Sequence, residues 1–173
     1  MVVYVMRHAE AIEESETLQD EWRYLTEKGR SAAAKMSSAI AKIGPKPRLT
    51  ITSPLTRAVQ TAEFAAEKAC RKNVVIASGL LLPGADITEL AAYLKGCKSA
   101  KRILLVGHEP QLGSLVANLL GREDESITLK KGACVALELH PEKDDKPAGF
   151  LWYLAPGKKW VSSFKKAFPQ QKS

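Results

Sequence analysis

The sequence predicts an α/β fold, namely a single three-layer α/β/α domain with a central, mostly parallel sheet. Short apolar runs rich in β-branched residues alternate along the chain with amphipathic segments of helical period. Several runs are apolar throughout, as strands are when helices cover both faces of a sheet. The 173 residues suffice for one domain with a sizeable core, and no internal repeat or linker divides them. This pattern does not predict the order of the strands.

The first strand is expected at residues 2–6, an apolar run that ends at Arg7. Residues 11–25 are acid-rich and lack periodicity, so we expect a loop with room for a helical turn. Its acids are interpreted as a solvated loop, with a place on the rim of a site as the alternative: Glu13, Glu14, Glu16, Asp20 and Glu21. Thr26 can cap a helix that reaches about Ile43, because apolar residues recur there every three or four positions before Gly44-Pro45.

A second strand is expected at residues 48–52, followed directly by Ser53-Pro54. Serine is a good N-cap and proline suits the first helical position, so this pair predicts a helix that continues to about Arg71. Its expected inner face consists of Val59, Ala62, Ala66 and Ala69. A third strand is expected at residues 74–77.

The second half continues the alternation after an apolar loop or strand end at residues 80–84. Asp86 is expected to cap a short helix that Gly96 ends. A strongly apolar strand at residues 102–106 precedes a helix that runs to Leu120 and is capped by Gly121. Two later strands are expected at residues 133–139 and 150–154, with a charged turn at 140–149 in which His140 is a surface residue.

The domain is expected to comprise residues 1–155, followed by a basic C-terminal tail at residues 156–173. The net charge is +7, but the tail holds five lysines and no acids, which leaves +2 for the rest of the chain. The basic character therefore does not predict a nucleic-acid surface. Trp160, Phe164 and Phe168 recur every four residues, which predicts a helix docked by its aromatic face, with a membrane or partner surface as the alternative.

The cysteines and the apolar runs exclude several classes of protein. Cys70, Cys97 and Cys134 are odd in number and widely spaced, so we expect free thiols rather than a disulfide framework or a zinc site. No apolar run approaches the ~20 residues of a membrane span, and no basic leader precedes the first run. We therefore expect a cytoplasmic protein that does not enter a membrane.

Four side chains that attract phosphate follow strands of the predicted sheet. Arg7 and His8 follow the first strand, Arg57 lies in the first turn after the second, and His108 follows the fourth. Because the carboxyl ends of parallel strands share one edge, these side chains should meet there. Fixed guanidinium donors stabilise the charge that a phosphoryl group spreads over its oxygens, and a histidine can accept that group covalently. Such a site requires no metal or other cofactor, since the arginines supply positive charge.

The motifs around these residues resemble the histidine phosphatase superfamily, also called phosphoglycerate mutase-like. Arg7-His8-Ala9 is similar to its Arg-His-Gly signature, residues 53–62 (SPLTRAVQTA) match its second motif, and residues 106–110 (VGHEP) resemble its third. The short chain and the Met-Arg-His start resemble the small SixA-type phosphohistidine phosphatase branch. The similarity in order and spacing runs from residue 2 to about residue 120. It implies that His8 is the nucleophile and that Arg7, Arg57 and His108 bind the phosphoryl group.

The sequence departs from this family at two places. Ala9 stands where glycine is usual, and a methyl group there could crowd the turn. Leu80 to Pro83 has no carboxylate where many relatives carry a general-acid glutamate. Asp86 is the nearest alternative, and we interpret it as a plain helix cap. A missing acid favours a phosphohistidine substrate over a sugar phosphate, because imidazole accepts a proton easily near neutral pH.

The sequence thus predicts a metal-independent phosphatase acting on phosphohistidine in proteins. The expected partner is a phosphohistidine-bearing phosphotransfer domain, and Lys130-Lys131-Gly132 is either a loop or a site of attraction for an acidic phosphoprotein. One alternative is a phosphatase or mutase for small phosphate esters, and another is a non-catalytic domain that binds phosphoproteins. Nucleic acid and membrane partners are not expected, and a monomer is the favoured oligomeric state.

Overall fold

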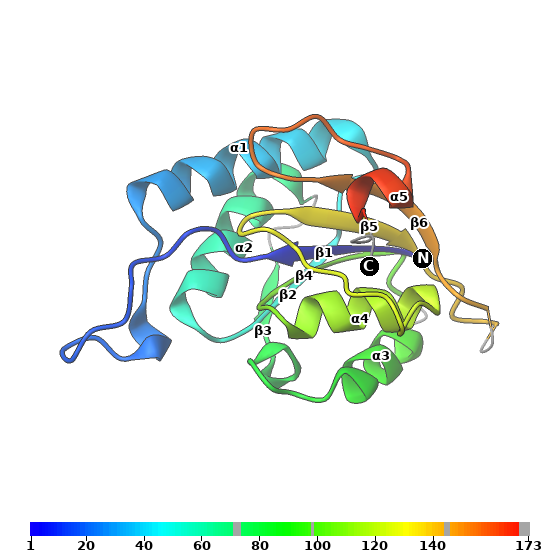
Figure 1. The fold of residues 1–173 in the computed structure, drawn as a ribbon, viewed down its shortest axis with the longest axis horizontal. Helices are drawn as coiled ribbons and strands as arrows, with labels where there is room; N and C mark the ends of the chain where they lie inside the picture. The colour runs from blue at the N-terminus through cyan, green and yellow to red at the C-terminus, as the bar shows by residue number, and fades with distance from the viewer. Residues whose placement is uncertain (71–73, 98, 144–145, 170–173) are drawn as a thin grey trace.

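A six-stranded mixed sheet forms the centre of the computed structural model, which describes residues 1–70, 74–97, 99–143 and 146–169 (Figure 1). The strands are β1 (Val2–Arg7), β2 (Leu49–Thr52), β3 (Val75–Ala77), β4 (Arg102–Gly107), β5 (Cys134–Glu138) and β6 (Gly149–Leu154). They lie in the order β3-β2-β4-β1-β5-β6. The first four are parallel, whereas β5 pairs antiparallel with both β1 and β6. The predicted α/β class with a mostly parallel sheet is confirmed.

Helices cover both faces of this sheet. The α-helices are α1 (Glu27–Ile43), α2 (Thr56–Ala69), α3 (Ile87–Gly96), α4 (Gln111–Leu120) and α5 (Phe164–Ala167), and the 3₁₀ helices are η1 (Asp20–Trp22) and η2 (Gly79–Leu81). In Figure 1, α1 and α2 lie on one face while α3 and α4 lie on the other. None of the helices in the described ranges is long and apolar enough to cross a membrane.

Strand β1 shows how the period-two alternation of a strand divides the core between these layers. Val3 and Val5 belong to the cluster that includes residues of α3 and α4, whereas Tyr4 and Met6 belong to the cluster with α1 and α2. All four are at most 1% exposed, because β1 is a central strand covered on both faces. An uninterrupted apolar run was therefore the correct signal for this strand.

Most of the predicted helix ends are confirmed. They could be predicted because local interactions define them. The Thr26 side chain accepts from Gly29 N, the Asp86 side chain accepts from Thr88 N, and Gly121 adopts φ 63° after α4. The prediction for α2 was wrong at its start, where Leu55 is the N-cap and the helix begins at Thr56. Ser53 lies two residues upstream, where its Oγ accepts from Leu55 N at 3.3 Å and has a second partner, described below.

The inner face of α2 differs from the prediction in one detail. Val59 is only half-buried, and the packed face of α2 includes Ala58 and Ala65 besides the predicted alanines. The predicted end of this helix at Arg71 lies outside the described residues, as do positions 144–145 of the charged turn and 170–173 of the tail. The three cysteines are free, and Cys70 and Cys134 are buried.

The tail packs on β6, but not as the single amphipathic helix that the spacing predicted. Phe164 and Phe168 contact the ring of Phe150, and Phe168 also contacts Tyr153. Trp160 lies before α5 and is 50% exposed, so the prediction that it docks with the two phenylalanines was wrong. Val161 forms an antiparallel bridge with Tyr153 and α5 begins only at Phe164, so Trp160 is not in helical register with the two phenylalanines.

Candidate active site

The four predicted side chains meet at the carboxyl edge of the parallel strands. β4 lies between β1 and β2, with Arg7 opposite Gly107 and Thr52 opposite Val106. Backbone bonds continue beyond the strands, from His8 N to Gly107 O at 3.0 Å and from Ser53 N to Val106 O at 2.9 Å. The rings of His8 and His108 consequently lie 5.0 Å apart, centroid to centroid. This edge is where ligands bind in open α/β sheets.

His8 is held in the state that a nucleophile needs. Its Nδ1 lies 2.7 Å from Ala9 O, which can only accept a hydrogen bond, so Nδ1 carries the proton and Nε2 keeps its lone pair. The pKa of His8 is lowered from 6.5 to about 4, mainly by burial and also by the charges of Arg57, Arg7 and Lys131, against the opposing effect of the Ala9 bond. His8 is therefore neutral at physiological pH, with a free ring nitrogen in a cationic site.

His108 is held in place by Ser53, which the sequence predicted to be the N-cap of a helix. His108 Nε2 lies 2.8 Å from Ser53 Oγ, and both residues are buried. Burial lowers the pKa of His108 to about 3, and the charges of His8 and Arg57 act in the same direction. The bond to Ser53 uses one ring nitrogen, which leaves Nδ1 for a ligand. Ser53 thus orients the second imidazole instead of capping α2.

Arg7 is anchored at one end and open at the other. Its Nη1 donates to Leu129 O at 2.9 Å, while its Nε is buried and has no hydrogen-bond partner among the described residues. A buried donor without a partner is costly, which makes it suited to an anionic ligand. Backbone bonds from Arg7 N to Ala133 O and from Gly132 N to His8 O bind the segment before β5 to this strand end.

Glu109 contacts the segment before β5 through the backbone of Leu129. Burial raises the pKa of its carboxyl, against hydrogen bonds from the backbones of Leu129 and Gly113 and the charge of Arg7. Glu109 lies in the third motif (VGHEP) but had no predicted role. Its position next to His108 in the chain was the one available signal.

Arg57 is buried in the site, and its guanidinium is paired with Asp20. It is 4% exposed, and its Nη1 and Nη2 donate to the backbone oxygen and the Oδ2 of Asp20 at 2.7 and 2.9 Å. Burial raises the pKa of Asp20, but its bonds to Arg57 and Arg23 outweigh burial and leave that pKa lowered. Asp20 is thus ionised at neutral pH. From the sequence, Asp20 was named only as one of five loop acids, with a place on the rim of a site as the alternative.

The loop at residues 11–25 is ordered around this contact. Ala11 and Leu25 form an antiparallel bridge, and Leu25 N donates to the Gln60 side chain of α2 at 2.8 Å. Arg23 donates to Ile12 O at 2.7 Å and to Asp20 at 2.9 Å. The interpretation as a solvated loop was therefore wrong for Asp20, which η1 carries to the rim of the site. The Asp20 and Arg23 spacing of three, typical of a helical ion pair, was the signal that could have found it.

Ala9 fits where the sequence raised the possibility of crowding. It is 1% exposed, and its N–H donates to Thr61 Oγ1 at 3.1 Å. No non-glycine residue in the described parts of the chain has a positive φ, so the turn after β1 does not require glycine. The substitution is compatible with the site.

The segment that lacks a carboxylate is fixed by α4. Gln111 Nε2 donates to Leu80 O and Ala85 O at 3.0 and 2.9 Å, and Leu81 is buried in the core. Asp86 caps α3, as predicted. The described residues contain no cluster of His, Cys, Asp or Glu that could hold a metal ion.

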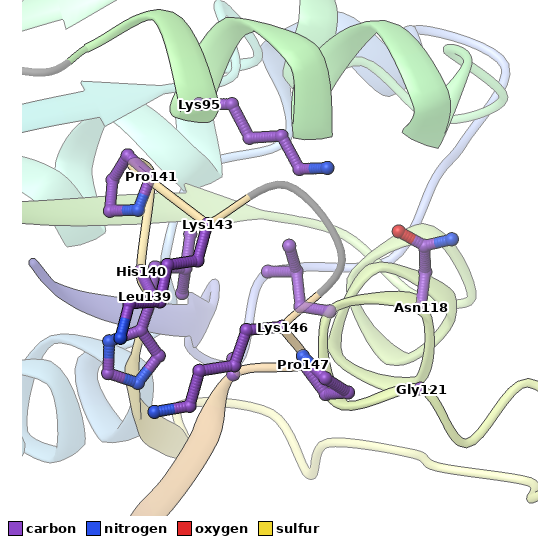
Figure 2. A pocket seen from close by; sticks show the side chains of 11 residues that line it. Lys95, Asn118, Gly121, Leu139, His140, Pro141, Lys143, Lys146 and Pro147 are labelled. Carbon is purple, nitrogen blue, oxygen red and sulfur yellow. The ribbon is translucent and has the colours of Figure 1, made fainter.

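A separate hollow of about 180 Å³ lies at the opposite end of the sheet, where β5 ends (Figure 2). Lys95, Asn118, His140 and Lys146 contribute to its lining. His140 follows β5, whose direction is opposite to that of β1, so it lies away from His8 and His108. The third histidine is thus outside the candidate site, in agreement with its interpretation as a turn residue.

Comparisons with known proteins agree with this geometry. The model of the histidine phosphatase superfamily (branch 1) matches residues 3–80. A protein from Picosynechococcus sp. is 27% identical over 164 residues, which cover 93% of this chain and 99% of that protein. The fold is similar to that of the protein histidine phosphatase SixA complexed with tungstate, with a TM-score of 0.79 and 24% identity over 90% of this chain and 97% of that chain. It is also similar to the alpha-ribazole phosphatase from Shigella flexneri, with a TM-score of 0.64 and 16% identity over 81% of this chain and 91% of that chain.

Proposed function

We propose that this chain, whose residues 3–80 match the model of the histidine phosphatase superfamily, is a member of that superfamily and a metal-independent phosphatase with His8 as its nucleophile. The observation that carries the proposal is the state of His8, whose Nδ1 is hydrogen-bonded to Ala9 and whose Nε2 is free in a site with two arginines. Arg7 Nε supports it as an open donor for a phosphoryl oxygen. The resident charges also explain why such a site needs no metal ion.

The reaction would proceed in two displacements. His8 Nε2 forms a bond to phosphorus, the bond from phosphorus to the leaving atom breaks, and the electron pair departs with that atom. Water then attacks the phosphohistidine, which releases phosphate and restores neutral His8. Arg7, Arg57 and Nδ1 of His108 would stabilise the charge on the phosphoryl oxygens in both steps.

We propose phosphohistidine in proteins as the substrate. The carboxyl groups near the site favour this substrate: Leu80 to Pro83 has none, Asp86 caps α3, and Asp20 is held ionised by two arginines. Glu109 is half-buried and hydrogen-bonded to the backbones of Leu129 and Gly113. An ionised carboxylate cannot supply the proton that an alkoxide leaving group needs. An imidazole leaving group takes its proton from solvent near neutral pH. The tungstate complex of SixA is consistent with an oxyanion site in a protein of this fold.

Turnover in the presence of a chelator tests the proposal. The protein is mixed separately with a phosphohistidine-bearing phosphotransfer domain, a phosphoserine peptide and a sugar phosphate, and phosphate release is followed. Mass spectrometry after an alkaline quench locates any phosphate on His8. We expect release from the phosphohistidine protein, label on His8, and loss of turnover in His8→Ala.

His140→Ala is the matched control, because it removes a histidine at the opposite end of the sheet. Phosphate release only from the sugar phosphate would support His8 as the nucleophile. It would contradict the proposed phosphohistidine substrate and indicate small phosphate esters instead. Full activity in His8→Ala would exclude the mechanism. Tight binding of the phosphoprotein without release from any substrate would favour a binding domain.

A further inference from the structure

A groove of about 580 Å³ lies between the segment before β5 and the chain that follows β6. Four lysines line it, namely Lys130, Lys158, Lys159 and Lys166, together with apolar surface from Tyr153 and Phe168. No aspartate or glutamate is among its described lining residues. The groove therefore combines a cationic rim with partly apolar walls.

The groove lies at the same edge of the sheet as His8. Since β1 and β6 both run antiparallel to β5, the end of β6 and the start of β5 lie beside the end of β1. Figure 1 shows the loops before β5 and after β6 at the end of the sheet where β1 points. The Tyr153 hydroxyl is hydrogen-bonded to the Lys130 backbone, and two residues further Gly132 N donates to His8 O at 2.9 Å. One short segment thus borders both the groove and the nucleophile.

The charges of this groove are open to a ligand. All four lysines are exposed, and none forms an ion pair with another described residue. Elsewhere on the surface, Lys28 and Lys68 pair with Glu10 and Glu67 at 3.0 and 2.9 Å. Clustered cations without counter-charges raise the local potential and attract acidic partners over about 8 Å at physiological ionic strength.

We propose that this lysine-lined groove binds an acidic segment of the phosphorylated protein while His8 receives its phosphoryl group. The inference rests on the proposed function and adds a determinant of partner choice outside the phosphoryl site. Charge complementarity of this kind acts on encounter and specificity, so it should appear mainly in KM. A small phosphoramidate cannot reach the groove and should be indifferent to it.

Two peptides test the proposal, each with one phosphohistidine, flanked in one by a run of glutamates and in the other by a run of glutamines. We expect the wild-type protein to prefer the glutamate peptide by about tenfold in kcat/KM at low salt, and to lose this preference at high salt. Lys159→Glu with Lys166→Glu should abolish the preference while leaving turnover of phosphoramidate unchanged. Arg48→Glu with Lys101→Glu is the matched control, because it reverses two exposed charges at the opposite end of the sheet.

Equal kcat/KM for the two peptides in the wild-type protein would overturn the proposal, as would a preference that survives in the groove variant. An equal loss in groove and control variants would reduce the effect to net charge and also overturn it. If neither the two peptides nor phosphoramidate is turned over, the proposed phosphatase function is wrong, whether or not the groove binds acidic segments. Fluorescence anisotropy with labelled peptides then decides the groove alone, since wild type should still bind the glutamate peptide more tightly than the groove variant does.

Discussion

The protonation of His8 is set by its immediate surroundings, which makes it testable without knowledge of the substrate. Its pKa is lowered from 6.5 to about 4, mainly by burial. In the proposed mechanism the neutral form of His8 attacks phosphorus, so the competent state is complete near neutral pH and is lost only as the pH falls through about 4. An NMR titration of the imidazole signals, with His8 assigned by comparison with His8→Ala, should give a midpoint near 4. A midpoint at 6.5 would contradict this environment.

The same shift predicts how stability depends on pH. Between 6.5 and about 4 the unfolded chain binds a proton at this position that the folded protein resists. The free energy of unfolding should therefore fall as the pH is lowered through that range, and His8→Phe should flatten the decline. Chemical denaturation at a series of pH values measures both.

Asp20 should compete with phosphate for Arg57. Its carboxylate accepts from Arg57 Nη2 and brings negative charge to the place where a phosphoryl group would bind. We expect Asp20→Asn to raise the affinity for orthophosphate by about tenfold, equivalent to about 1.4 kcal/mol, as measured by calorimetry. Glu21→Gln removes the same charge from the neighbouring residue and should have little effect. A weaker affinity in Asp20→Asn would show instead that Arg57 depends on this carboxylate for its alignment.

At the scale of elements, the contact between α4 and the segment before β5 depends on Gly113, which has no side chain. A Cβ on Gly113 would lie 2.0 Å from the backbone oxygen of Ile127, and this segment leads to Leu129, which accepts from Arg7. Gly113→Ala should therefore lower the free energy of unfolding by about 3 kcal/mol, as overpacking against backbone does. It should also weaken orthophosphate binding through the displaced Arg7.

Gly96→Ala is the control for this prediction. Gly96 is the last residue of α3, and a Cβ there meets nothing within 4 Å. Alanine in a helix is favoured over glycine by about 0.5 to 1 kcal/mol, so this variant should be unchanged or slightly more stable. Urea unfolding compares the two directly. Similar losses in both would show that the close approach at Gly113 is unimportant.

For the whole molecule, the tail should stabilise the fold through its phenylalanines alone. Phe168 is 6% exposed and contacts Tyr153 and Phe150, whereas Trp160 is 50% exposed. Phe168→Ala should cost about 3 kcal/mol of unfolding free energy, while Trp160→Ala should stay within about 0.5 kcal/mol of wild type. A comparable loss in the two variants would contradict the observed packing.

The predictions from sequence succeeded where short-range interactions decide the structure. Thr26 and Asp86 cap helices by bonds to residues two or three positions away, and Gly121 ends α4 by its own backbone conformation. The predictions failed where a residue distant in the sequence forms a competing hydrogen bond. Ser53 had the local features of a cap, but its hydroxyl pairs with His108, which lies 55 residues away. No local pattern contains that information.

The sequence by itself determined the alternation of strands and helices. It also placed Arg7, His8 and His108 at strand ends and Arg57 in the first turn of the helix after the second strand. Parallel pairing of β1, β4 and β2 was then enough to bring these four together. Only the tertiary structure decided which of five loop acids reaches Arg57, which partner orients His108, and that the antiparallel β5 and β6 place lysines beside the site. These features depend on contacts between distant segments, which form because the whole core closes and not because any local propensity favours them.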